Sequence, residues 1–340
     1  MIVEASPAGY KAVSKLYNAL MTGLVLTLIG HRSAEAARSF VFAHFRRQHL
    51  EKFLPGLKKL GLDALPNAVA CAKYHYFSNA LGGVKTEYMP ESDTKAWVRY
   101  PPPRWIWRDA AICAVPREVN EAMLHGWHGH NGVTLGNPRL GFVCTGQTVN
   151  GDPGLEGYYY EYDHDLAPEE RVRFVDDERS PQFDPARAPK LDSADWPAER
   201  LLKVERSYAM EYVRSMLPTM CGLFEVDEAR ALVGRTARLI GLQYYDEIAA
   251  LLGVGGNGAA DFAFLLAALA VAQGEQVDVQ YDGGLATLTQ SGWRLMYNVT
   301  EGDTMFDAWN ALWEGALAVH NRDLKLVTER RGETIAWRIG

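Results

Sequence analysis

The stretch "AQGEQVDVQY" (272–281) decides the fold of the C-terminal half of this chain. An apolar, alanine-rich segment ends at Gly274, and apolar and polar residues then alternate from Val277 to Tyr281. A glycine after an apolar helical segment is typical of a helix end, and strict alternation is typical of a half-buried strand. The stretch therefore predicts a helix that ends at glycine and leads directly into a strand.

The same passage occurs in the N-terminal half. The segment "LPNAVACAKYHYFSNALGG" (65–83) predicts a helix that ends at Gly82, and the alternating "VKTEY" follows it. Gly61 and Gly82 are separated by the same number of residues as Gly253 and Gly274. These matched glycine intervals favour two copies of one unit.

Each half continues with the same predicted elements, in the order helix–helix–strand–strand–helix–strand–strand. After the first strand, the strand, helix, strand and strand of the first half are "TKAWVRY" (94–100), "PREVNEAMLHGWHG" (116–129), "LGFVCT" (140–145) and "GYYYEYD" (157–163). The corresponding elements of the second half are "LATLTQS" (285–291), "DTMFDAWNALWEG" (303–315), "LKLVTE" (324–329) and "TIAWRIG" (334–340). The predicted fold class is therefore α+β, with a first, catalytic copy over 1–163 and a second, structural copy over 201–340. Between them, 164–200 is acidic and proline-rich and predicts a linker or a wrapping arm.

Three features of the second copy carry a resemblance to known proteins. They are the helix "GRTARLIGLQYYDEIAALLG" (234–253), the passage "AQGEQVDVQY" and the closing "WEGAL…NRDLKLV…IAWRIG", and the first copy follows the pattern more loosely. The copy resembles the 4-vinyl reductase-like and TRAPP-component group of domains and the L-2-amino-thiazoline-4-carboxylic acid hydrolase-like proteins. The resemblance implies tandem α+β domains that form an internal pseudo-dimer, ligand pockets between helices and sheet, and a tendency to form homo-oligomers. A cysteine expected near the final strand is replaced by Ala336 and Trp337, which argues against cysteine chemistry.

Composition excludes several classes of partner. The chain has 340 residues, a formal net charge of −7 and no dominant basic patch, so no nucleic-acid partner is expected. Its four cysteines show no CxxC or similar spacing, which predicts neither a zinc framework nor disulfides and suits the cytoplasm. The apolar run "ALMTGLVLTLIG" (19–30) is too short to span a bilayer. We expect it to form a buried helix, with no membrane partner.

Three histidines crowd the stretch "LHGWHGHNG" (124–132), at the end of the third predicted helix of the first copy. His125, His128 and His130 are the predicted catalytic residues, because an imidazole with a pKa near 6.5 takes and gives a proton at neutral pH. The matching stretch of the second copy contains none of these histidines. Glu161 or Asp163, on the closing strand of the first copy, is predicted to fix the tautomer of one of them, and Glu161 is the residue included among the predicted catalytic residues.

Two other interpretations of this stretch stay open. The histidines could converge on a divalent metal ion, since imidazole is a suitable ligand and Gly129 allows the helix to unwind. They could also form a structural helix end, either solvated or hydrogen-bonded in the core. No HExxH-type pattern is present, so a metal is not part of the leading prediction. The glycine-rich stretch 252–261 follows a predicted helix and not a strand, so it lacks the context of a dinucleotide-binding motif, and no organic cofactor is predicted.

Residues predicted to bind a substrate come from three further stretches. The loop "RYPPPRWIWRD" (99–109) offers tryptophans that could stack on a flat ligand and arginines that could hold a carboxylate. The helix over 65–83 presents polar side chains four residues apart on one face. Along the strand 157–163, alternate tyrosines face one way, while Tyr159 and Glu161 face the other. The predicted substrate-binding residues are His75, Asn79, Arg104, Trp105, Trp107, Tyr158 and Tyr160.

These features predict an enzyme that acts on a small molecule without an organic cofactor. The expected reaction is the hydrolysis of a small, flat or ring-bearing carboxylate by histidine acid–base chemistry, with a histidine of the 125–130 cluster as general base. One alternative is a non-catalytic small-molecule-binding module of the vinyl-reductase-like group. The other is a metal-dependent lyase.

Overall fold

The computed structural model describes residues 4–103, 107–191, 196–297 and 299–340. The chain divides into two compact units. The middle unit is Leu28–Pro197, and the terminal unit joins Met1–Thr27 to Ala198–Gly340. This division differs from the predicted domain boundaries in two places. The segment Met1–Thr27 groups with the C-terminal half, and the stretch from 164 to 197 belongs to the middle unit instead of forming a separate linker.

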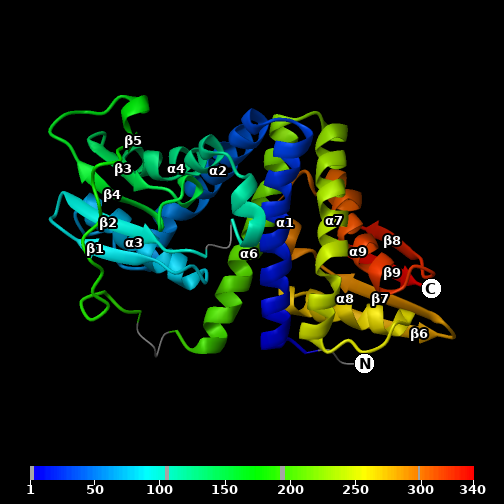
Figure 1. Cartoon of the computed structure of the whole chain (residues 1–340). Coiled ribbons are helices and arrows are strands. Elements are labelled where there is room, and N and C mark those ends of the chain that lie inside the picture. The colour runs from blue at the N-terminus through cyan, green and yellow to red at the C-terminus, as the bar shows by residue number, and fades with distance from the viewer. Residues whose placement is uncertain (1–3, 104–106, 192–195, 298) are drawn as a thin grey trace. The chain divides into compact units, whose positions relative to one another are not determined.

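The middle unit combines helices with a mixed sheet (Figure 1). Its helices are α2 (Ala34–Lys59), α3 (Asn67–Leu81), α4 (Arg117–Gly126) and α5 (Asn131–Thr134). Its strands are β1 (Glu87–Pro90), β2 (Lys95–Tyr100), β3 (Leu140–Gly146), β4 (Leu155–Glu161) and β5 (Val172–Phe174). Short 3₁₀ helices lie at Asp109–Ala114, His128–His130, Thr148–Asn150 and Pro168–Glu170.

The terminal unit combines longer helices with an antiparallel sheet (Figure 1). Its helices are α1 (Pro7–His31, of which 28–31 group with the middle unit), α6 (Ala198–Leu223), α7 (Val226–Leu252), α8 (Ala259–Gln273) and α9 (Gly302–His320). Its strands are β6 (Gln276–Asp282), β7 (Leu285–Ser291), β8 (Leu326–Arg331) and β9 (Thr334–Ile339), and a 3₁₀ turn lies at Arg294–Met296.

The two units share a strand order. The sheet of the middle unit runs β1-β2-β4-β3-β5, and the sheet of the terminal unit runs β6-β7-β9-β8. The neighbours among β1 to β4, and likewise among β6 to β9, pair antiparallel. Strand β5 pairs with β3 in parallel. Among the described residues of the terminal unit, no strand pairs with the equivalent strand β8 in this way. The α+β class is confirmed, and both units contain the element order helix–helix–strand–strand–helix–strand–strand.

Glycines end the helices as predicted. Helix α8 ends at Gln273, and Gly274 follows with a φ of +94°, a conformation that glycine adopts at little cost. Helix α3 ends at Leu81, and Gly83 takes a φ of +75°. Strand β6 follows almost at once, whereas β1 begins only at Glu87, later than "VKTEY" predicts.

Helix α1 contains the apolar run 19–30. Among the described residues, it is the helix long and apolar enough to cross a membrane, but 67% of its most apolar window is buried inside the protein. Within the terminal unit, the Tyr17 hydroxyl donates to Gln273 at 2.8 Å, and the Thr236 hydroxyl donates to Thr27 at 2.8 Å. The predicted buried helix is confirmed, because α1 packs as a core helix of this unit.

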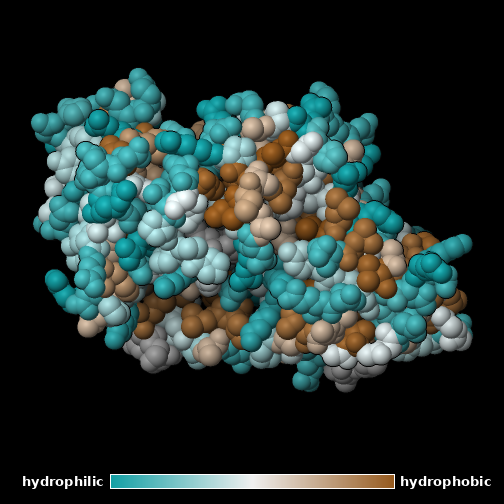
Figure 2. Space-filling view, viewed as in Figure 1, coloured by the Kyte–Doolittle hydropathy of each residue, from teal (hydrophilic) through white to brown (hydrophobic). Residues whose placement is uncertain are grey.

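Helix α7 carries both buried and exposed apolar side chains. Leu232 and Ile248 belong to the core, whereas Leu239, Leu242 and Leu251 are 37% to 47% exposed. Figure 2 shows apolar residues at the surface in this part of the terminal unit. The buried side of α7 packs against α9.

The chain after β4 wraps over the sheet of the middle unit. Strand β5 extends the edge at β3, and Val175 and Phe183 then cover one face of the sheet. We call this face the outer face; its buried core consists of Met89, Trp97, Val143 and Tyr158. Of the two structures predicted for 164–200, the described part forms the wrapping arm.

Candidate functional site

Three glycines shape the histidine stretch 124–132. Helix α4 ends at Gly126, where a Cβ would lie 2.6 Å from a backbone oxygen of α2. A Cβ on Gly129 would lie 2.8 Å from a side chain of β5, and one on Gly132 would lie 2.5 Å from a backbone oxygen of β3. Glycine at every third position therefore lets three neighbouring elements approach the backbone. The single helix predicted here is wrong beyond Gly126, since a 3₁₀ turn and the short α5 follow.

The three histidines of this stretch point to different surroundings. The His125 ring lies beside Phe174, with ring centroids 5.9 Å apart. His130 donates its Nδ1–H to the carbonyl oxygen of His125 at 2.9 Å. His128 points into the interior and is only 6% exposed. The rings do not converge, and no group of three or more His, Cys, Asp or Glu residues that could hold a metal ion occurs in the described part of the chain.

His128 is hydrogen-bonded to Tyr159, which comes from β4. The Tyr159 hydroxyl oxygen lies 2.6 Å from His128 Nδ1, and Asn131 Nδ2 donates to the same oxygen at 2.8 Å. Asn131 Nδ2 can only donate to that oxygen, so among the hydrogen bonds of the described residues His128 Nδ1 is the acceptor for the phenol proton. The imidazole proton is then on Nε2. Tyr159 therefore holds the tautomer of His128, a role that the sequence had assigned to Glu161.

His75 joins this cluster from α3. Its ring stacks on that of His128, with centroids 4.1 Å apart and an interplanar angle of 12°. It also lies 5.8 Å from the ring of Tyr159 and is 5% exposed. Asn79 donates its Nδ2–H to the backbone oxygen of His75 at 2.8 Å, so its amide is directed at the helix. The structure thus brings together His75 and His128, which lie far apart in the sequence.

Burial controls the ionisation of the cluster. Tyr159 is completely buried, and this burial raises its pKa well above 10, so the phenol keeps its proton and stays a donor. The half-buried His125 and His130 have pKa values below the usual 6.5, chiefly because burial disfavours the charged ring. Burial therefore favours the neutral form of these two imidazoles, which lie beside the cluster.

Two further histidines form a buried layer on α2. Burial is the main cause that lowers the pKa of His44 and of His49 to about 3 each, and nearby arginines add to it. The His49 ring stacks on Phe53 at 4.9 Å and meets Trp127 edge-on at 5.6 Å. Arg46 donates to His49 Nδ1 at 2.7 Å. Both histidines are fully buried and are therefore neutral in the folded chain.

Several predicted residues lie outside this cluster. Glu161 forms an ion pair with Arg139 at 2.6 Å and has no hydrogen bond to a histidine among the described contacts. Trp107 is buried, and its Nε1–H donates to Asn120 at 2.9 Å, which ties the end of the loop to α4. Arg104 and Trp105 lie outside the described residues.

Tyr158 and Tyr160 lie on the outer face of the sheet, opposite His128. The Tyr158 hydroxyl donates to Glu178 of the wrapping arm at 2.7 Å, and its ring packs on Trp97 at 4.5 Å. Tyr160 lies 6.4 Å from Tyr158, ring to ring. The predicted alternation along β4 is confirmed, and it separates both tyrosines from the histidines.

Tyr159 and Asn131 are the site residues that sequence reasoning missed. The alternation of β4 placed Tyr159 on the face opposite Tyr158, but nothing local showed that this face meets the histidines. Asn131 follows His130 directly and was overlooked because its role depends on a tyrosine far along the chain. Comparison of the chain with protein-family models, with curated proteins and with solved structures finds no match.

Proposed function

We propose that this chain is an enzyme that hydrolyses a small, flat or ring-bearing carboxylate at the histidine cluster of the middle unit. The observation that carries the proposal is the hydrogen bond between Tyr159 and His128, supported by Asn131. These bonds hold one imidazole in one tautomer within an aromatic, water-poor environment. In such an environment, a fixed donor stabilises a developing oxyanion far more than it does in water.

In the proposed scheme, His128 presents its Nε2–H to the substrate. A neutral imidazole of this kind donates to a carbonyl oxygen as negative charge develops on it. His75, stacked on His128, acts as general base for the attacking water. This scheme transfers the base role from the 125–130 cluster to His75. Because His75 and His128 are only 5% and 6% exposed, the site has to open before a substrate enters.

The variant Tyr159→Phe is expected to lower kcat/KM by about 10²-fold, the lower end of the usual contribution of a positioned acid or base. The change removes only the hydroxyl that holds the tautomer of His128. The assay uses 2-amino-thiazoline-4-carboxylate, the substrate class named by the resembling hydrolases, and follows ring opening by mass spectrometry.

Tyr245→Phe is the matched control. Tyr245 donates to His320 Nδ1 at 2.5 Å in the terminal unit, so this variant removes the same kind of bond outside the site. It should leave kcat/KM nearly unchanged. Equal losses in both variants, or no loss in either, would contradict the proposal.

The two alternative functions give different results in the same assay. A binding module retains the carboxylate, which is recovered unchanged after prolonged incubation. A metal-dependent lyase forms a product that has not gained water, loses its activity to a chelator and regains it with a divalent ion. Hydrolysis that is insensitive to the chelator supports the proposed mechanism over both.

We also propose that the two units are copies of one vinyl-reductase-like domain. Their common element order and strand order support a duplication. The internal pseudo-dimer, the homo-oligomer and the cytoplasmic location stay predictions. The terminal unit contains a single histidine, His320, so the proposed chemistry belongs to the middle unit alone.

A further inference from the structure

One face of helix α7 carries exposed side chains along most of its length. Leu239 and Leu242 are 47% and 37% exposed, although α7 is a core helix of the terminal unit. The helical period places four further exposed residues on the same face. We call this set the α7 stripe; it consists of Ala231, Arg235, Leu239, Leu242, Asp246 and Ala250.

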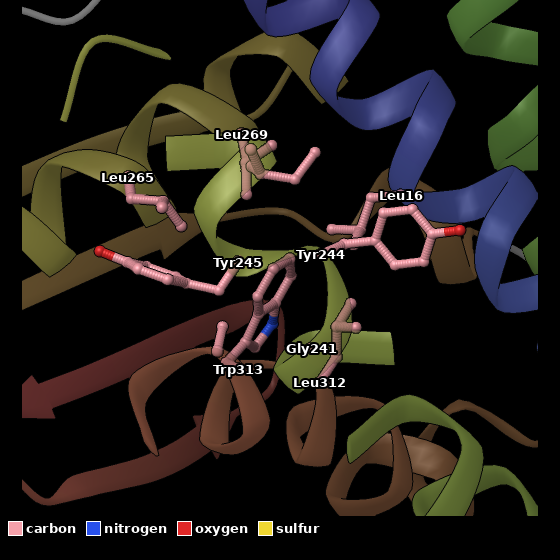
Figure 3. A pocket seen from close by; sticks show the side chains of 10 residues that line it. Leu16, Gly241, Tyr244, Tyr245, Leu265, Leu269, Leu312 and Trp313 are labelled. Atoms are coloured by element: carbon pink, nitrogen blue, oxygen red, sulfur yellow. The ribbon is translucent and has the colours of Figure 1, made fainter. Parts of the chain in front are cut away.

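The other side of α7 is covered by the rest of the terminal unit. Gly241 meets the backbone of α9, and the Tyr245 hydroxyl is hydrogen-bonded to His320 at the end of α9. Figure 3 shows Gly241 and Tyr245 among side chains of α1, α8 and α9. The α7 stripe points away from these contacts and is accessible to another molecule.

The two charged residues of the α7 stripe lack partners. Neither the Arg235 guanidinium nor the Asp246 carboxylate forms an ion pair or a hydrogen bond within the described ranges of the chain. Beside them, Arg238 pairs with Glu314 of α9 at 3.4 Å. Arg235 and Asp246 lie about three turns apart, roughly 16 Å along the helix axis, so they cannot reach each other.

The α7 stripe is symmetric about its own midpoint, which lies between Ile240 and Gly241. At equal distances on either side of this point, leucine matches leucine, Arg235 matches Asp246 and alanine matches alanine. In a two-fold symmetric pair of antiparallel helices, residues at equal distances from the axis meet across the interface. Two copies of α7 would therefore bring four leucines together and place each Arg235 opposite Asp246 of the partner subunit.

We propose that the α7 stripe is an interface with a second copy of this chain, packed antiparallel about a two-fold axis at that midpoint. The leucines form the apolar centre, and the two Arg235–Asp246 pairs flank it and fix the register. A parallel pair would instead place like charges side by side. The stripe belongs to the terminal unit and the proposed hydrolysis to the middle unit, so either proposal can fail without the other.

Charge reversal tests this interface in the full chain, by sedimentation velocity over a series of concentrations. The unaltered chain should form a dimer. Arg235→Glu and Asp246→Arg should each weaken that dimer by about 10- to 100-fold, because the symmetry puts two like-charge contacts into the interface for every single change.

An equal mixture of the two variants should dimerise again. In the mixed dimer, opposite charges meet at both contacts, because one variant reverses only the positive end of the stripe and the other only the negative end. This rescue requires direct contact between the two positions. It also separates a lost contact from a lost fold, since an unfolded variant would not be rescued by the other.

Arg230→Glu is the matched control, because it makes the same change of charge on α7 outside the stripe. Arg230 pairs with Asp227 and donates to the backbone oxygen of Thr304 at 3.3 Å. This variant should keep the dimer. The proposal is overturned if the unaltered chain stays monomeric at the highest measurable concentration, if Arg235→Glu dimerises as strongly as the unaltered chain, or if the mixture stays monomeric.

Discussion

Lowering the pH from 7.5 to 5 is expected to destabilise the middle unit by about 4 kcal/mol, through two buried histidines. His44 and His49 have folded-state pKa values of about 3, against the ordinary 6.5. Between those values the unfolded chain binds more protons than the folded chain, so stability falls as the pH falls. Each histidine contributes about 2 kcal/mol at pH 5, and the loss continues toward pH 3.

Urea unfolding at a series of pH values measures this effect. In His44→Phe one of the two buried titrating rings is absent, so the loss between pH 7.5 and 5 should fall to about half. His164→Gln is the control, because the side chain of His164 is 58% exposed in the folded chain. A free energy of unfolding that is flat over this range, or that has the same slope in His44→Phe, would show that these rings are not buried as neutral groups.

Gly241→Ala is expected to destabilise the terminal unit by about 3 kcal/mol or more, the upper range for overpacking. The new Cβ would overlap the Leu312 carbonyl oxygen and lie 2.9 Å from the Ala316 amide nitrogen. Both atoms belong to the backbone of α9, so neither can move aside as a flexible side chain would. The two helices would have to separate. This separation would also break the close contact of Gly315 with the backbone of α7.

Gly234→Ala is the matched control on the same helix. A Cβ at Gly234 would lie 3.6 Å from Ala308, which is ordinary van der Waals contact. Alanine is the better helix former by about 1 kcal/mol, so this variant should be as stable as the unaltered chain or more so. Thermal unfolding of both variants checks the prediction. Similar melting temperatures for the two would mean that α7 and α9 do not meet at Gly241.

The candidate site was predictable in its residue types but not in its connections. His128 stood out because histidines crowd one stretch, and His75 because it lies on a polar helix face. Their stacking joins α3 to the segment after α4, and no local pattern encodes that contact. The alternation along β4 placed Tyr159 on the correct face of the sheet, but the hydrogen-bond partner of its hydroxyl depends on which helices cover that face. Glu161 was expected there and instead binds Arg139 at the end of its strand.

What the sequence determined by itself was the order and type of the elements. Glycines that take a positive φ, such as Gly253 and Gly274, end helices through local backbone preference. The alternation of apolar and polar residues over 285–291 predicted a strand with one buried face, and β7 confirms it. These signals act over a few residues, so they can be recognised without knowledge of the fold.

Only the tertiary structure decided which distant segments meet. It grouped Met1–Thr27 with the C-terminal half, laid β5 along β3 and set the order of strands in each sheet. It also broke the third helix of the middle unit at Gly126, where close backbone contacts replace a side chain. Such outcomes depend on packing between elements that are far apart in the chain. The free energy of burying their faces together outweighs the weak local preferences of a stretch such as "LHGWHGHNG".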